Sequence, residues 1–255
     1  MNNIQGGIGI SVAREPTGIK GFDEIIEGGL LAGRVYVTSG PPGSGKTTFS
    51  TQFLAQGAMN GSYGAYITLN ETVDSIVADM SNYAFNLPKL IELKKLHFVD
   101  LGPSAMYGAQ EQFDYPMQDY GSPDNIPSPR YIFEKIREYV TDHGITRVVI
   151  DSISAIRFLH DDYATEEKSI SRFIRNLKSL GCTTIILSEM TDPSTYTIEH
   201  FAADGVIFMH NFFDPAKNRM TRGIQVIKMR GTKHDCNIHK AKFTSNGLMV
   251  GGKIE

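Results

Sequence analysis

The chain has 255 residues, of which 41% are hydrophobic and 21% are charged, and its formal net charge is −3 at pH 7. This composition is that of a globular protein with a substantial core, and the charge gives no general attraction to nucleic acid. No run approaches the roughly 18 apolar residues of a membrane span, and residues 1–3 lack the charge and apolar core of a signal peptide, so we expect no membrane contact.

The N-terminal residues 1–13 are rich in Gly and Asn, and they are predicted to form a flexible arm. Residues 14–255 are predicted to form one domain, because short apolar runs alternate with helical periodicities along this length. These runs predict strands at Arg34–Ser39, Ala65–Leu69, Leu96–Asp100, Arg147–Asp151, Thr184–Ser188, Gly205–His210 and Ile224–Met229. Their central residues are mostly apolar, as in a parallel sheet that is covered on both faces.

Helices are predicted where apolar residues recur three and four positions apart between these strands. The segments are residues 47–60, residues 73–80 after a Thr72 cap, residues 132–140 before Gly144 and residues 170–180 before Gly181. The alternation predicts an α/β fold with a doubly wound, mostly parallel sheet that binds ligands at the carboxyl ends of its strands. Residues 221–250 hold two β-like runs with no helix between them, which predicts a C-terminal antiparallel β extension.

Residues 102–129 interrupt this alternation. They are rich in Tyr, Gly and Pro, and they contain Glu111, Asp114, Asp119 and Asp124 but neither Lys nor Arg. A loop of this length inside a compact domain is usually functional or disordered. We interpret the segment as an insertion loop that forms a lid or contacts protein partners, with a passive, variable insertion as the alternative.

The two cysteines, Cys182 and Cys236, match no zinc or redox spacing. Cys182 lies just before the apolar run of residues 183–187, which favours a buried and inert thiol. Free thiols are typical of a reducing compartment, and we therefore expect a cytoplasmic protein.

The most specific motif is Gly40-Pro41-Pro42-Gly43-Ser44-Gly45-Lys46-Thr47, which lies between a predicted strand and a predicted helix. Its glycines let backbone N–H groups converge on phosphate oxygens, and the helix N-terminus adds a positive field. A simple turn would leave Lys46 and Thr47 unexplained. The motif therefore predicts a bound nucleoside triphosphate such as ATP. The predicted contacts are Gly43, Ser44, Gly45, Lys46, Thr47 and Thr48.

Two acidic residues extend this site. Asp151 ends an apolar strand, and together with the Thr47 hydroxyl it is predicted to hold Mg²⁺. Glu71 follows the strand at residues 65–69 and is the predicted base for an attacking water. The alternative for Glu71 is an acid that complements the dipole of the helix that begins after Thr72.

These motifs together resemble the RecA-like ATPases, and among them the single-domain KaiC-like proteins. The resemblance runs in order from about residue 15 to residue 252. The residues that carry it are Pro16–Asp23, Gly28-Gly29, Gly40–Thr47, Asp151–Ala155, Leu177–Gly181 and Lys228–Asp235. The resemblance implies a RecA-like phosphate-loop NTPase core, Mg-ATP as ligand, and a homo-oligomeric ring, commonly a hexamer, with ATP between subunits.

The resemblance also implies that one subunit completes the nucleotide site of its neighbour. Lys228 and Arg230 are thereby assigned to catalysis with Lys46 and Glu71, and the full set reaching across is Lys228, Met229, Arg230, Thr232, His234, Thr244 and Ser245. Because Lys228 and Arg230 alternate on a predicted strand, they share one face, which suits a grip on an anion. Without the resemblance, a solvated basic strand edge would be favoured.

The chain departs from this family in two places. The family usually has two adjacent glutamates where this chain has Asn70-Glu71, and an amide can orient a water but cannot accept its proton. Hydrolysis is therefore expected to be slow or to depend on Glu71. The family includes a clock protein with two halves, an ATPase half and an autokinase half that carries an adjacent Ser-Thr pair. Residues 199–204 lack this pair and resemble the ATPase half, so we expect no self-phosphorylation of that type.

Three functions remain open at this point. The first is a ring-forming regulatory or signalling ATPase that acts through protein partners. The second is a RecA-type recombinase paralogue that binds DNA, although the loops at residues 157–167 and 190–199 hold one Arg against six acids. The third is a nucleotide-binding structural subunit with little turnover, which Asn70 favours.

Overall fold

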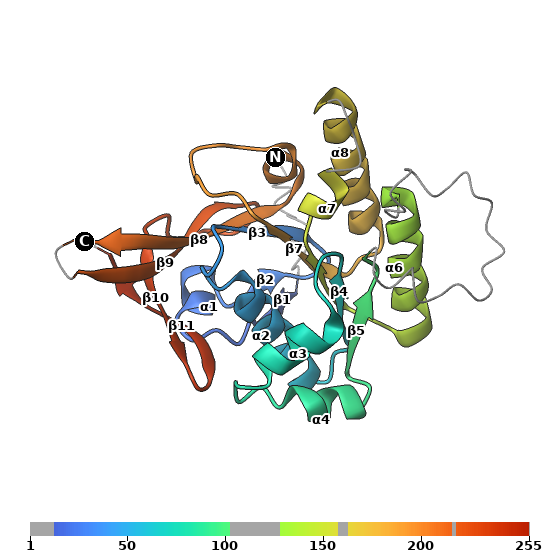
Figure 1. Ribbon diagram of the computed structural model, residues 1–255, viewed down its shortest axis with the longest axis horizontal. Coiled ribbons are helices and arrows are strands. Elements are labelled where there is room, and N and C mark those ends of the chain that lie inside the picture. The colour runs from blue at the N-terminus through green and yellow to red at the C-terminus, as the bar shows by residue number, and fades with distance from the viewer. Residues whose placement is uncertain (1–12, 103–127, 158–162, 216–217, 255) are drawn as a thin grey trace, which may run out of the picture.

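The computed structural model describes residues 13–102, 128–157, 163–215 and 218–254. Within these ranges the core is a nine-stranded sheet in the order β11-β10-β9-β8-β3-β7-β6-β4-β5 (Figure 1). The strands are β3 (Val35–Ser39), β4 (Gly64–Thr68), β5 (Leu96–Asp100), β6 (Arg147–Asp151), β7 (Thr183–Ser188), β8 (Gly205–Asp214), β9 (Arg219–Met229), β10 (His239–Thr244) and β11 (Gly247–Lys253). The predicted α/β fold with a mostly parallel sheet and an antiparallel extension is confirmed.

The strands from β8 to β5 in this order run parallel, so their carboxyl ends meet at one edge of the sheet. In contrast, β9 runs antiparallel to β8, and β10 and β11 continue in alternating directions. The end of β9 therefore lies beside the start of β3 and β8, whereas the end of β10 lies at the carboxyl edge of the parallel strands.

Two layers of helices cover the sheet (Figure 1). One layer contains α1 (Phe22–Ile25), α2 (Lys46–Met59), α3 (Val73–Met80) and α4 (Leu87–Glu92), and the other contains α6 (Pro129–His143), α7 (Ser154–Arg157) and α8 (Tyr163–Ser179). Successive strand residues alternate between the two cores: Tyr36 and Tyr66 pack in the first, and Val37 and Ile67 pack in the second.

The helix ends follow the local signals in the sequence. Thr72 caps α3 by accepting a hydrogen bond from Ser75 N, and α6 ends at Gly144, whose φ of 61° is left-handed. Ser128 caps α6 by accepting a hydrogen bond from Tyr131 N. The helix begins at Pro129, the last residue of the predicted insertion loop. That loop boundary was wrong by one residue, because Pro is well tolerated in the first helical turn.

Two predicted segments lie outside the described residues: residues 1–12 of the expected arm and residues 103–127 of the insertion loop. A small second sheet precedes the core, in which β1 (Arg14–Glu15) pairs with β2 (Leu30–Leu31). In the ranges that are described, no helix combines the length and apolarity needed to cross a membrane.

Candidate nucleotide-binding site

The phosphate loop connects β3 to α2 at the carboxyl edge of the parallel strands. Gly45 is the N-cap of α2 with φ 106°, and a Cβ added there would lie 2.4 Å from Phe243 Cζ. Only glycine fits this backbone, and because it has no side chain, the N–H groups of the first turn of α2 stay open to an anion. Ser44 Oγ is buried without a hydrogen-bond partner among the described residues, as expected for a group that a phosphate would satisfy.

The Lys46 side chain folds back over this loop. Its Nζ donates hydrogen bonds to Gly40 O at 2.8 Å and to Pro41 O at 3.2 Å. Burial lowers the pKa of Lys46, and the nearby carboxylates of Glu189 and Asp151 oppose that shift. The ammonium therefore lies where carbonyl oxygens hold it, and phosphate oxygens can replace those carbonyls.

A cavity of about 360 Å³ opens beside the loop. Apolar side chains from distant segments form one wall, and the complete lining is Gly43, Gly45, Lys46, Thr47, Thr48, Glu71, Ile76, Asp79, Met80, Tyr83, Arg222 and Phe243. Arg222 Nε donates to Gly43 O at 3.1 Å, and its guanidinium lies 4.9 Å from the centre of the Phe243 ring. A phosphate loop beside aromatic and aliphatic side chains suits a nucleotide with a planar base.

Asp151 lies at the end of β6, close to Lys46 and Thr47. The Tyr66 hydroxyl donates a 2.5 Å hydrogen bond to Asp151 Oδ2. Burial raises the pKa of Asp151, and Glu71 adds to this shift, whereas the Tyr66 hydrogen bond and Lys46 oppose it.

These oxygens fit a magnesium ion that also binds nucleotide phosphates. A hydroxyl and a carboxylate are hard donors, and Mg²⁺ usually takes only one or two protein ligands beside phosphates and waters. The described part of the chain holds no group of three or more His, Cys, Asp or Glu that could hold a metal ion. Asp151 and Thr47 both act on the Tyr66 hydroxyl, so the two candidate ligands lie near the same phenolic oxygen.

Glu71 and Asn70 differ in how they are held. Thr68 Oγ1 donates to Glu71 O at 2.6 Å and accepts from Glu71 N at 3.1 Å, which fixes the backbone while the exposed Glu71 side chain lines the cavity. Asn70 Nδ2 instead donates to Ser152 Oγ at 2.9 Å. The amide is therefore anchored at the end of β6, whereas the Glu71 side chain, like that of Asp79, lines the cavity.

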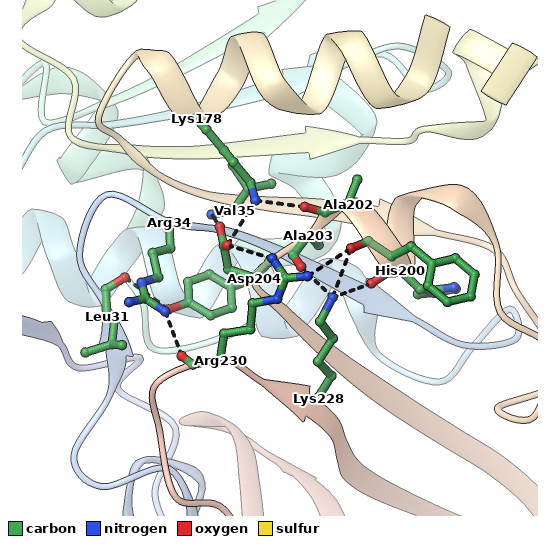
Figure 2. A network of polar contacts seen from close by, with 12 residues as sticks. Leu31, Arg34, Val35, Lys178, His200, Ala202, Ala203, Asp204, Lys228 and Arg230 are labelled. Atoms are coloured by element: carbon green, nitrogen blue, oxygen red, sulfur yellow. Dashed lines mark hydrogen bonds and ion pairs between the residues drawn. The ribbon is translucent and has the colours of Figure 1, made fainter. Parts of the chain in front are cut away.

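Lys228 and Arg230 lie at the opposite edge of the sheet from the phosphate loop, because β9 is antiparallel to β8. Figure 2 shows both side chains pointing to the turn between α9 (Ile198–Ala202) and β8. Lys228 Nζ donates to the carbonyl oxygens of His200 at 2.8 Å, Phe201 at 3.1 Å and Ala203 at 2.7 Å. Burial lowers the pKa of Lys228, and the neighbouring Arg230 lowers it further.

Arg230 is held more loosely than Lys228. Its side chain is 56% exposed, and its guanidinium lies 3.9 Å from Asp204 Oδ1 and 3.5 Å from Phe201 O. Asp204 is engaged elsewhere, since it accepts from Val35 N at 3.2 Å and from Lys178 Nζ at 2.9 Å (Figure 2). Of the two cations, Arg230 is the one free to contact a group outside its own protomer.

A family model described as "ATPase: KaiC" matches residues 15–255. This chain belongs to the KaiC family. It is 33% identical over 252 residues to the circadian clock oscillator protein KaiC of Prochlorococcus marinus subsp. pastoris, covering 97% of this chain and 47% of that protein. The KaiC of Synechococcus elongatus is 28% identical over 245 residues, with coverage of 94% and 44%. The chain thus spans less than half the length of these curated relatives.

A solved KaiC-family structure matches the whole fold. The KaiC-like protein from the hyperthermophilic archaeon Pyrococcus horikoshii OT3 superposes with a TM-score of 0.77 at 28% identity, covering 94% of this chain and 100% of that one. The similarity to KaiC-like proteins inferred from the motifs is therefore confirmed.

The residues that the KaiC resemblance assigned to a neighbour's nucleotide fall in two groups. Met229 is buried, Thr232 Oγ1 accepts from Arg14, and His234 Nδ1 lies 3.0 Å from Thr232 O, all near the end of β9. Thr244 instead ends β10 at the edge that carries the phosphate loop, and Ser245 follows it, where Ser245 O accepts from Ala84 N next to Tyr83 of the cavity. The two groups therefore lie at opposite edges of the sheet.

Several residues near this KaiC-family site were not predicted from the sequence. They are Tyr66, Tyr83, Arg222 and Phe243. None lies in a motif, and each reaches the phosphate loop or Asp151 through sheet pairing or helix packing. The prediction of a strand in a sheet covered on both faces indicated that Tyr66 is buried, but not that its hydroxyl meets Asp151.

Proposed function

We propose that this chain binds Mg-ATP and hydrolyses it slowly in a homo-oligomer, with each nucleotide between two protomers. The observation that carries the proposal is the placement of Lys46 and Arg230 at opposite edges of one sheet. An exposed arginine that is remote from its own phosphate loop can reach the phosphates of a loop-bound nucleotide only in another protomer. In a closed ring, every Arg230 meets the nucleotide of a neighbouring protomer. The family resemblance implies that this ring is a hexamer.

In this proposal the loop N–H groups and Lys46 bind the phosphates, and Thr47 and Asp151 hold Mg²⁺. The metal supplies charge that offsets the developing negative charge on the phosphates. Glu71 accepts the proton of the attacking water, and Asn70 stays anchored to Ser152.

The proposed neighbour contacts follow from the same geometry. Arg230 stabilises the transferring phosphoryl group of the adjacent protomer, and Lys228 fixes the backbone from which Arg230 projects. Thr244 and Ser245 lie at the loop edge, so their proposed contact with a nucleotide includes the one bound by their own protomer. The segment at residues 102–129 remains the proposed surface for a protein partner of a regulatory ATPase.

A combined assembly and turnover measurement tests the proposal. We expect light scattering of the purified chain with Mg-ATP to give a mass several times that of the 28.2 kDa protomer, together with phosphate release. Lys46→Ala should abolish nucleotide binding, and Lys89→Ala, an exposed lysine paired with Glu92, is the matched control. A monomer that hydrolyses ATP at the full rate would contradict the shared site. Binding without phosphate release above background would leave only a nucleotide-binding role.

A further inference from the structure

The short helix α9 contacts three strands: β3, which leads into the phosphate loop, β7, and β9, which carries Lys228 and Arg230. The His200 ring of α9 contacts Ser39 at the carboxyl end of β3. The carbonyl oxygens at the C-terminal end of α9 receive the Lys228 ammonium (Figure 2). One residue of this helix, His200, contacts both sides. Its ring meets the strand that leads into the phosphate loop, and its carbonyl oxygen accepts the Lys228 ammonium at 2.8 Å.

The hydrogen bonds of the His200 ring define its tautomer. Thr197 N donates to His200 Nδ1 at 3.1 Å, so Nδ1 must be the acceptor. Burial lowers the pKa of His200, and the ring is therefore neutral with its proton on Nε2. This Nε2–H donates to Ser39 Oγ at 2.8 Å. Both partners are buried, with His200 3% exposed and Ser39 fully covered, so the bond is shielded from water.

Ser39 is the residue that immediately precedes the phosphate loop. It ends β3, and the next residue, Gly40, provides the carbonyl that holds Lys46 Nζ at 2.8 Å. Ser39 therefore lies one residue from the carbonyl that Lys46 would release on turning to a phosphate. The Ser39–His200 hydrogen bond links this position to α9 and to the carbonyls that hold Lys228.

A second side chain of α9 ties the helix to the far side of the site. Glu199 is fully buried, forms an ion pair with Arg157 and accepts a hydrogen bond from Ser188 Oγ at 3.0 Å. Ser188 ends β7 directly before Glu189, whose charge acts on Lys46. The helix is thus tied to the end of the strand that leads into the phosphate loop and to the end of the neighbouring strand β7.

We propose that His200 is a positioning residue that couples the phosphate loop of one protomer to the Lys228–Arg230 cations that it offers to the next protomer. This inference rests on the proposed function, since it requires nucleotide in the loop. It adds that occupation of one site adjusts the cations at the adjacent site through the Ser39–His200 hydrogen bond and the α9 carbonyls. By linkage, contact of those cations with a neighbour's nucleotide changes the affinity of the loop.

Hydrogen exchange with mass spectrometry tests the coupling without requiring turnover. The probe is Mg²⁺ with adenylyl imidodiphosphate, and two peptides are followed, residues 40–50 for the phosphate loop and residues 197–204 for α9. In the wild type we expect the probe to slow exchange in both peptides, by about five- to tenfold in α9. In Ser39→Ala and in His200→Asn the loop should remain protected while the α9 response is lost.

His200→Gln is the conservative variant that separates coupling from packing. An Asn side chain can still accept from Thr197 N but cannot reach Ser39, whereas a Gln Nε2 has the same number of bonds from the backbone as the histidine Nε2. We therefore expect His200→Gln to restore most of the α9 response. If Ser39→Ala does not fold, the comparison of His200→Asn with His200→Gln still shows whether the α9 response depends on the hydrogen bond to Ser39.

The outcomes separate this inference from the function on which it rests. Loop protection without any change in α9, in the wild type, overturns the coupling and leaves nucleotide binding intact. An α9 response that survives in both Ser39→Ala and His200→Asn also overturns it. Failure of the probe to protect the loop at all contradicts the proposed ATP binding, and the coupling falls with it.

Discussion

The Tyr66 hydroxyl donates to Asp151 Oδ2 at 2.5 Å, and this bond joins the middle of β4 to the end of the neighbouring parallel strand β6. It favours the charged form of a carboxylate that burial and two neighbouring acids, Glu71 and Glu189, push towards protonation. Since a magnesium ligand must be deprotonated, Tyr66 would support the proposed metal site without being a ligand itself.

Replacing this tyrosine gives a pH-dependent prediction. Burial raises the pKa of Asp151 and the Tyr66 hydrogen bond lowers it, so Tyr66→Phe should raise that pKa further. The acid limb of Mg-dependent phosphate release should then move to higher pH, which a rate profile in saturating Mg-ATP measures. Tyr36→Phe, which removes a buried hydroxyl from Leu31 O, is the matched control. An acid limb that stays in place would count against a supporting role for Tyr66.

Arg230→Ala is expected to leave nucleotide binding nearly intact while turnover falls by a factor on the order of 10³, the range of a cation that acts from a neighbouring subunit. Kd for a fluorescent ATP analogue, phosphate release and assembly mass are measured together. Arg230→Lys keeps the charge but loses the planar fork, and it should recover only part of the rate. Full activity and full assembly in Arg230→Ala would remove this residue from the neighbour's site.

Glu71→Gln should lower phosphate release by about 10²-fold or more, with little change in ATP affinity, because the proposed base is lost. Asn70→Glu is expected to act in the opposite direction and raise turnover, since it introduces a second carboxylate at the end of β4. Single-turnover phosphate release separates both effects from product release. If Glu71→Gln hydrolyses ATP at the wild-type rate, Glu71 is a helix-start acid and not the base.

The buried Arg147 gives a prediction about stability. Its guanidinium is 2% exposed and donates to Pro16 O at 3.0 Å and Phe53 O at 2.8 Å, and Nε lies 3.1 Å from Glu15 Oε2. Arg147→Ala leaves Glu15 and two carbonyls without this partner and should lower the free energy of unfolding by about 3–5 kcal/mol. Urea unfolding measures the loss, with Arg137→Ala as the exposed control paired with Glu134. A loss equal to that of the control would show that the buried contacts contribute little.

The fold could be predicted because its signals are local. The apolar strand at residues 147–151, the Thr72 cap and the helix that stops at Gly144 each depend on residues within one or two turns, and all agree with the structure. The phosphate loop is equally local, since its strand, glycines and helix are contiguous. The roles of the individual site residues remain predictions.

The rest of the site could not be predicted because it depends on register and direction. The Tyr66–Asp151 bond spans 85 positions and the Ser39–His200 bond spans 161, and no short pattern encodes either. Periodicity indicated that Lys228 and Arg230 share a face, but not that three carbonyls hold Lys228. The opposite placement of Thr244 and Arg230 depends on the reversal between β9 and β10. The sequence predicted an antiparallel extension here, but not that β9 runs antiparallel to β8, which decides the edge at which each end lies.

The reversal at β9 gives the molecule a polarity. In the proposed function, one edge of the sheet receives the phosphates, and the other edge carries Arg230, whose ion pair with Asp204 is 3.9 Å long. A row of such protomers joined loop to cation would begin with an unused receptor and finish with an unused donor. A closed ring would leave neither unmatched, so closure of the proposed assembly would follow from charge pairing as well as from shape.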